Sequence, residues 1–154
     1  MSLLRAMVHY VIAFPEKLHH PKEDAYLFRK LRARTREFDA TLDELERQHE
    51  EGHAIVAELT RSIDAYKANP NGGSARFAAA VERFATTQMQ HMMIETKVIL
   101  PAAQQHLTDD DWREIETAFA GNDDPRLAVD SDEEFRQLFA RIQNLLPESA
   151  STSR

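Results

Sequence analysis

The feature that most constrains this chain is an apolar helical stripe interrupted by histidine and carboxylate side chains. Between residues 77 and 102, positions at alternating steps of four and three residues mark one face of a helix. These positions are Phe77, Val81, Phe84, Gln88, His91, Glu95, Val98 and Ala102. A buried ionised carboxylate is costly unless a partner neutralises it, and a metal ion suits imidazole and carboxylate together. The stripe therefore predicts a metal site inside a helical protein.

A second stripe repeats this design in the preceding segment. Its core-facing positions are Phe38, Leu42, Leu45, His49, Gly52, Val56, Leu59, Ile63 and Tyr66. His49 lies at the centre of this stripe, and His53 lies one turn further on, at its edge. A third pair, His19 and Glu23, is four residues apart and therefore adjacent on a helix. Three helices can each offer two donors to one point inside a bundle.

The composition favours a single helical domain over residues 1–147, followed by a tail at 148–154 that we expect to be disordered. The 154 residues include only 4 glycines and 6 prolines, and no strand-like alternation stands out. A net charge of −7 argues against a nucleic-acid partner and against an anionic membrane surface. The absence of cysteine excludes disulfides, iron–sulfur clusters and thiolate zinc sites. No apolar run approaches the ~20 residues that span a bilayer, so we expect a cytoplasmic protein.

Periodicity and breaker residues predict an all-α fold. Three long helices are expected at about 3–35, 38–67 and 74–106, with two shorter ones at 108–120 and 132–146. The composition of residues 69–73 predicts a loop between the second and third helices. Thr108 and Asp111 have the spacing of a capping box. Long helices with short connections indicate an up-down antiparallel helical bundle with two shorter C-terminal helices.

Three motifs, in order, resemble those of the hemerythrin-like family, also called the HHE cation-binding domain. They are HHPKEDAYLF at 19–28, QHEEGHAIV at 48–56 and HMMIETKVILP at 91–101. The resemblance covers roughly residues 7–120. It implies a four-helix bundle that holds a pair of non-haem irons, with manganese or zinc as alternative metals.

The resemblance also implies a ligand set and a function. The implied metal ligands are His19, Glu23, His49, His53, His91 and Glu95, with the two glutamates bridging the metals. His20 and Asp24 share the spacing of His19 and Glu23, and the local pattern leaves either histidine possible, whereas the resemblance favours His19. His20, Asp24 and Gln88 are then expected to surround the ligands. Binding of oxygen or nitric oxide, or the handling of iron, is the implied function.

Two other functions remain open from the sequence. The first is a helical interaction module whose site is degenerate and metal-free. The second is a ferritin-like di-iron oxidase, which requires Glu-x-x-His on two helices. Glu16-x-x-His19, Glu46-x-x-His49 and Glu50-x-x-His53 have that form, but Gln88 occupies the equivalent position before His91. No residue is assigned a catalytic role, and a non-enzymatic protein is the favoured interpretation.

The family's first helix, which carries a lone histidine, has no counterpart in the sequence. The chain opens inside a segment that resembles the family's second helix. We therefore expect a truncated form or start-site variant of a longer hemerythrin-like protein. A bundle lacking one helix exposes an apolar groove, so a homodimer built across that groove is also expected.

Overall fold

The computed structural model describes residues 7–8 and 10–120, and every element within those ranges is helical. The first helical rod contains η1 (Ile12–His19), α2 (His20–Lys22), η2 (Glu23–Phe28) and α3 (Arg29–Arg34), where η marks π-helical turns. The second is α4 (Asp39–Ala68). The third contains α5 (Pro70–Ile94), η3 (Glu95–Ile99) and α6 (Leu100–His106), and the fourth is α7 (Asp109–Ala120). The expected helix at 132–146 and the tail at 148–154 lie outside the described residues.

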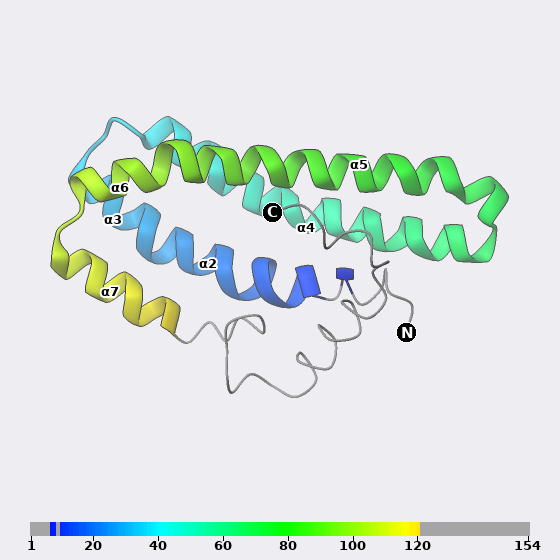
Figure 1. The fold of residues 1–154 in the computed structure, drawn as a ribbon, viewed down its shortest axis with the longest axis horizontal. Helices are drawn as coiled ribbons and strands as arrows, with labels where there is room; N and C mark the ends of the chain where they lie inside the picture. The colour runs from blue at the N-terminus through cyan, green and yellow to red at the C-terminus, as the bar shows by residue number, and fades with distance from the viewer. Residues whose placement is uncertain (1–6, 9, 121–154) are drawn as a thin grey trace, which may run out of the picture.

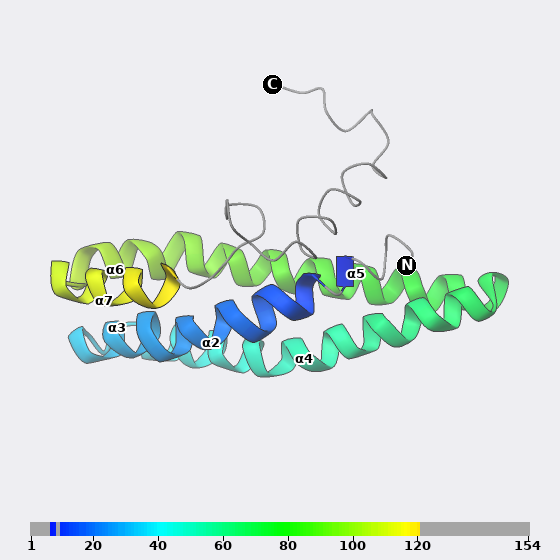
Figure 2. The same ribbon diagram turned by 90° about the horizontal axis from the view of Figure 1, so that it is seen from below.

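The rods form an up-down bundle, which confirms the predicted all-α architecture. α4 and α5 are antiparallel and pack along their length, while the first rod packs on α4 and η2 contacts α7 (Figures 1 and 2). α7 runs beside only one end of the bundle, so the α4–α5 hairpin extends well beyond it (Figure 1). Among the described helices, none is both long and apolar enough to cross a membrane.

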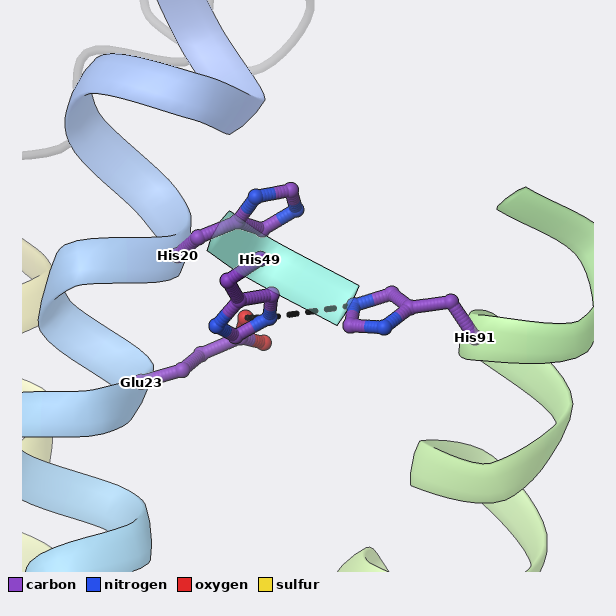
Figure 3. A group of neighbouring side chains, drawn as sticks. All are labelled: His20, Glu23, His49 and His91. Atoms are coloured by element: carbon purple, nitrogen blue, oxygen red, sulfur yellow. Dashed lines mark hydrogen bonds and ion pairs between the residues drawn. The ribbon is translucent and has the colours of Figure 1, made fainter. Parts of the chain in front are cut away.

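The core divides into two apolar clusters along the bundle. The first core cluster contains Leu27, Phe28, Leu31, Leu42, Leu45, Ile99, Ala102, Ala103, Leu107 and Ile115. The second core cluster contains Val8, Val56, Leu59, Ile63 and Ala80. Each of the three long rods has one buried histidine between the two clusters. These are His20 on the first rod, His49 on α4 and His91 on α5, all drawn in Figure 3. The apolar packing on either side holds these polar side chains in fixed positions.

The prediction of a loop at 69–73 is wrong, because Asn69 alone separates α4 from α5. The Asn69 side chain accepts a hydrogen bond from the Gly72 amide at 3.1 Å and caps the new helix. Pro70 occupies the first turn, where its missing N–H costs nothing. At Gly73 an added Cβ would lie 2.7 Å from the Tyr66 Cα, so glycine permits the close approach of the two helices. Asparagine, proline and glycine here form a tight connection between two helices and not an extended loop.

Two positions predicted to face the core are exposed. Val81 and Val98 retain 40 % and 36 % exposure, whereas Ile99 is fully buried. The π-helical turns of η3 shift the register, and Ile99 takes the core position predicted for Val98.

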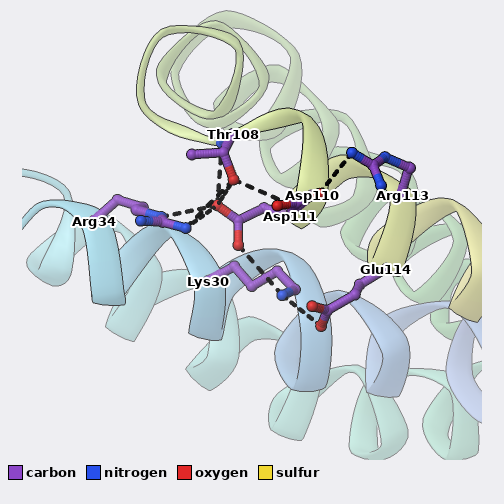
Figure 4. Close-up of polar contacts among 7 residues, drawn as sticks. All are labelled: Lys30, Arg34, Thr108, Asp110, Asp111, Arg113 and Glu114. Carbon is purple, nitrogen blue, oxygen red and sulfur yellow. Dashed lines mark hydrogen bonds and ion pairs between the residues drawn. The ribbon is translucent and has the colours of Figure 1, made fainter.

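A polar network attaches α7 to the first rod (Figure 4). The Asp111 amide donates to Thr108 Oγ1 at 3.3 Å, and the Thr108 amide donates to Asp111 Oδ2 at 3.0 Å, which confirms the capping box. Arg34 Nε donates to the same Asp111 carboxylate at 2.8 Å, and Lys30 Nζ lies 3.4 Å from its other oxygen. The hydrogen bond from the Thr108 backbone, with those from Arg34 and Lys30, holds the Asp111 pKa well below its usual range.

We predict that Asp111→Ala destabilises the protein by about 1–2 kcal/mol, because it removes a helix cap and the partner of Arg34. Trp112, the single tryptophan, packs against the first core cluster and reports α7 directly. Urea unfolding followed by its fluorescence measures the loss. Asp110→Ala is the control, because Asp110 is exposed and pairs with the exposed Arg113. An equal loss in both variants would contradict a special role for Asp111.

Candidate metal centre

Four buried side chains from three helical rods converge at the centre of the bundle (Figure 3). His20 and Glu23 come from the first rod, His49 from α4 and His91 from the end of α5. Each is at most 7 % exposed, and their potential ligand atoms all lie within 4.8 Å of one another. The group forms a buried cluster of donors that is able to hold a metal ion.

Asp24 determines the orientation of the His49 ring. The carboxylate Oδ1 lies 2.8 Å from His49 Nδ1, so the proton resides on Nδ1 and is donated to Asp24. The lone pair of His49 is then on Nε2, which faces the other donors. A carboxylate behind a histidine is the usual support for a metal-ligating imidazole.

Gln48 has the corresponding place behind His91. Its Oε1 lies 3.2 Å from His91 Nδ1, and its Nε2 donates to Glu44 Oε1 at 2.7 Å. The carboxylate of Glu44 accepts only from the NH₂ end, so the carbonyl end of the Gln48 amide faces His91. His91 Nδ1 therefore donates to Gln48, and Nε2, which lies 3.2 Å from Glu95 Oε1, is the ring atom that faces His49.

The Nε2 atoms of His49 and His91 face each other. His49 Nε2 and His91 Nε2 are 3.2 Å apart in a buried environment. Two imidazole nitrogens this close share either a proton or a cation, and carboxylate oxygens of Glu23 and Glu95 lie beside them. The arrangement is suited to coordination of a metal by both Nε2 atoms.

The carboxylates of Glu23, which is buried, and Glu95, which is half-buried, face the same histidines. Glu23 Oε1 is 3.0 Å from His19 Nε2, and its Oε2 is 3.6 Å from His49 Nε2. Glu95 Oε1 is 3.2 Å from His91 Nε2. Glu23 Oε2 and Glu95 Oε1 are buried and make no hydrogen bond within the described residues. Buried anionic oxygens of this kind are stabilised by a bound cation.

The π-helical turns border these donors in sequence. η1 ends at His19, η2 begins at Glu23, and η3 begins at Glu95. Pro15 lies inside η1 and removes one backbone donor there. A π-helical turn changes the helical register, and such turns are frequent at functional sites.

The structure places most of the predicted ligands around one point, with differences in detail. His20 lies inside the buried group of four, stacked on His49 with ring centroids 4.2 Å apart. His19 lies on the outer side of Glu23, with its ring edge-on to Phe119 of α7 at 5.5 Å. Glu95 flanks His91 from the same rod.

His53 lies further out than predicted. It is exposed and contributes to a pocket of about 220 Å³, which is lined by His20, Pro21, Asp24, His49, Glu50 and His53. The pocket leads from the surface to the buried His20 and His49. Gln88 is half-buried on α5, one turn before His91.

Gln48 is a site residue that the sequence analysis missed. It lies outside the apolar stripe of α4, and its partner His91 is 43 residues away in the chain. The periodicity of one helix contains no information about which side chain of another helix lies behind a histidine. Only its position directly before His49 was visible in the sequence.

Burial lowers the pKa of His20 from 6.5 to about 3, with further lowering by the neighbouring His49 and His91. A histidine that is neutral when folded but protonated when unfolded destabilises the folded state in acid. We predict that neutral His20 makes its full contribution to the free energy of unfolding of the metal-free protein above pH 6.5. This contribution is lost as the pH falls from 6.5 to about 3.

Urea unfolding of metal-free wild type and His20→Gln across this range measures the effect. The stability difference between the two proteins should shift steadily in favour of the variant below pH 6.5, because glutamine does not titrate. A pH-independent difference would show that His20 is not held neutral by its surroundings.

Comparison with known proteins gives one match. The family model for the hemerythrin HHE cation binding domain matches residues 2–103. Searches of curated proteins and of solved structures returned no match. The matched range includes all four members of the buried group, which come from its three long helical rods. The chain therefore belongs to the hemerythrin HHE cation-binding domain family.

Proposed function

We propose that this protein holds a pair of non-haem irons and uses them to bind oxygen or nitric oxide, or to handle iron. The observation that carries the proposal is the pair of Nε2 atoms of His49 and His91, 3.2 Å apart, with buried carboxylate oxygens of Glu23 and Glu95 beside them. This arrangement is unfavourable in a metal-free protein and favourable when cations are bound.

The number and type of donors support two metals of the iron type. The proposed ligands are His20, Glu23, His49 and His91 at the centre, flanked by His19 and Glu95, with His53 at the outer edge. Tetrahedral zinc takes four ligands, so this donor set exceeds the needs of one zinc ion. Imidazole and carboxylate without thiolate suit iron, and manganese and zinc are the metals to compare.

The pocket beside the donors supports a small ligand. The pocket has a volume of about 220 Å³. Its lining includes His20, Asp24 and His49, so it opens directly onto the buried group. A diatomic molecule fits such a space, whereas drug-sized ligands occupy pockets of roughly 300–1,000 Å³. When bound, the irons would supply reversible binding of the gas, and the residues would supply orientation and exclusion of water.

Anaerobic purification after expression in iron-rich medium tests the proposal. We expect two irons per chain by elemental analysis, and new visible absorption bands after exposure to oxygen or nitric oxide. His106→Ala is the matched control, because His106 ends α6 beside Phe38, outside the buried group, and should keep both irons. Stoichiometric zinc, or no metal, under these conditions would contradict the proposal.

A further inference from the structure

A line of hydrogen bonds connects the protein surface to His91. Arg47 donates to both oxygens of Glu44, at 2.8 Å through Nε and 2.6 Å through Nη2. Glu44 Oε1 also accepts from Gln48 Nε2 at 2.7 Å, and Gln48 Oε1 accepts from His91 Nδ1 at 3.2 Å. The first three residues belong to one turn of α4, and the last lies on α5.

We propose that Gln48 is a positioning residue that fixes the tautomer and ring orientation of His91, and that Glu44 fixes the orientation of the Gln48 amide. The two ends of an amide have the same shape and differ only in their hydrogen bonding. If the amide rotated by half a turn, its NH₂ group would face His91 Nδ1, and the proton of the ring would move to Nε2. That tautomer offers no lone pair toward His49 and cannot bind metal through Nε2.

Glu44 is well placed to prevent this rotation. Arg47 and Gln48 both donate to it, and these hydrogen bonds lower its pKa to about 2. It therefore remains an acceptor throughout the physiological pH range. Because an ionised carboxylate cannot donate, only the NH₂ end of Gln48 can face it.

The arrangement also makes the two facing histidines unequal. A carboxylate, Asp24, lies behind His49, whereas a neutral amide lies behind His91. A carboxylate partner raises the basicity of an imidazole ligand more than an amide does. This inference rests on the proposed metal function for its consequence, but the tautomer of His91 is a property of the metal-free protein.

Nitrogen NMR of metal-free protein tests the tautomer, and competition with a chelator tests the affinity for Fe²⁺. In Gln48→Leu we expect His91 to lose its preference for the Nδ1–H tautomer and iron affinity to fall about 10–100-fold. Gln48→Glu keeps an acceptor behind His91 and should therefore keep the Nδ1–H tautomer. Glu44→Leu should shift the tautomer of His91 in the same direction as Gln48→Leu. Gln104→Leu, at an exposed position of α6, is the matched control.

The tautomer of His49, which Asp24 holds independently, reports in each variant that the site is still folded. A His91 tautomer that is unchanged in Gln48→Leu would overturn the inference. If wild type binds no iron, the proposed function fails, and the tautomer measurement still decides the role of Gln48. Loss of iron with an unchanged tautomer would also overturn it, because Gln48 would then act in another way.

Discussion

His91→Ala is expected to abolish stable binding of the metal pair, with an affinity loss of about 100-fold or more, since changes behind a ligand alone cost 10–100-fold. The substitution removes the imidazole that α5 contributes to the buried group of four. It also leaves Glu95 Oε1 without the nitrogen that lies 3.2 Å away. Equilibrium dialysis against Fe²⁺ under anaerobic conditions measures the loss.

The matched control for this prediction is His106→Ala, which removes a histidine from the same rod at its far end. Its iron content should equal that of wild type. If His91→Ala retains two tightly bound irons, His91 is not a ligand, and the central role of the two Nε2 atoms is wrong.

Phe28→Ala is expected to cost about 3–5 kcal/mol of unfolding free energy, the usual range for removing a buried phenylalanine. Phe28 is fully buried in the first core cluster, and its ring stacks on His49 with centroids 5.7 Å apart and planes 11° apart. The cavity left by the missing ring would also remove the packing against one face of the His49 imidazole. We therefore expect weaker iron binding in the fraction of the variant that remains folded.

Urea unfolding of metal-free Phe28→Ala, followed through Trp112, measures this cost. Met93→Ala is the control, because Met93 is 62 % exposed on α5 and should change stability by less than about 0.5 kcal/mol. A cost below about 1 kcal/mol for Phe28→Ala would indicate that the first core cluster collapses around the missing ring.

The periodicity of the sequence was sufficient to predict the long helices because burial on one face imposes a regular spacing. The stripe of α4 is buried from Leu42 to Ile63, with His49 at 6 % exposure among apolar neighbours. A helical repeat could not reveal the π-helical turns, which break the spacing on which the argument depends. This is why Val98 was assigned to the core in place of Ile99.

The candidate metal donors were only partly predictable for the same reason. Residues four apart on a regular helix identified Glu23, His49, His91 and Glu95, and the structure brings these side chains close together. The choice between His19 and His20 depends on the turns η1 and α2, and the structure places His20 in the buried group. The contact between Gln48 and His91 depends on how two helices pack, which no single-helix pattern contains.

The ferritin-like alternative receives no support from the side chains that it requires. Glu46 pairs with Arg32 at 2.9 Å and lies outside the buried group. Glu50 is exposed and lines the outer pocket with His53. The expected homodimer stays a prediction, and light scattering of the purified chain tests it.

The most direct test of the metal centre is a crystal structure of iron-loaded protein with anomalous data collected at the iron edge. We expect strong anomalous peaks within coordination distance of His49 Nε2 and His91 Nε2, beside the carboxylates of Glu23 and Glu95. We also expect the Nδ1 atoms of the two histidines to remain within hydrogen-bond distance of Asp24 and Gln48. An absence of anomalous density at this position, with the iron bound elsewhere or not at all, would contradict a metal centre built on these residues.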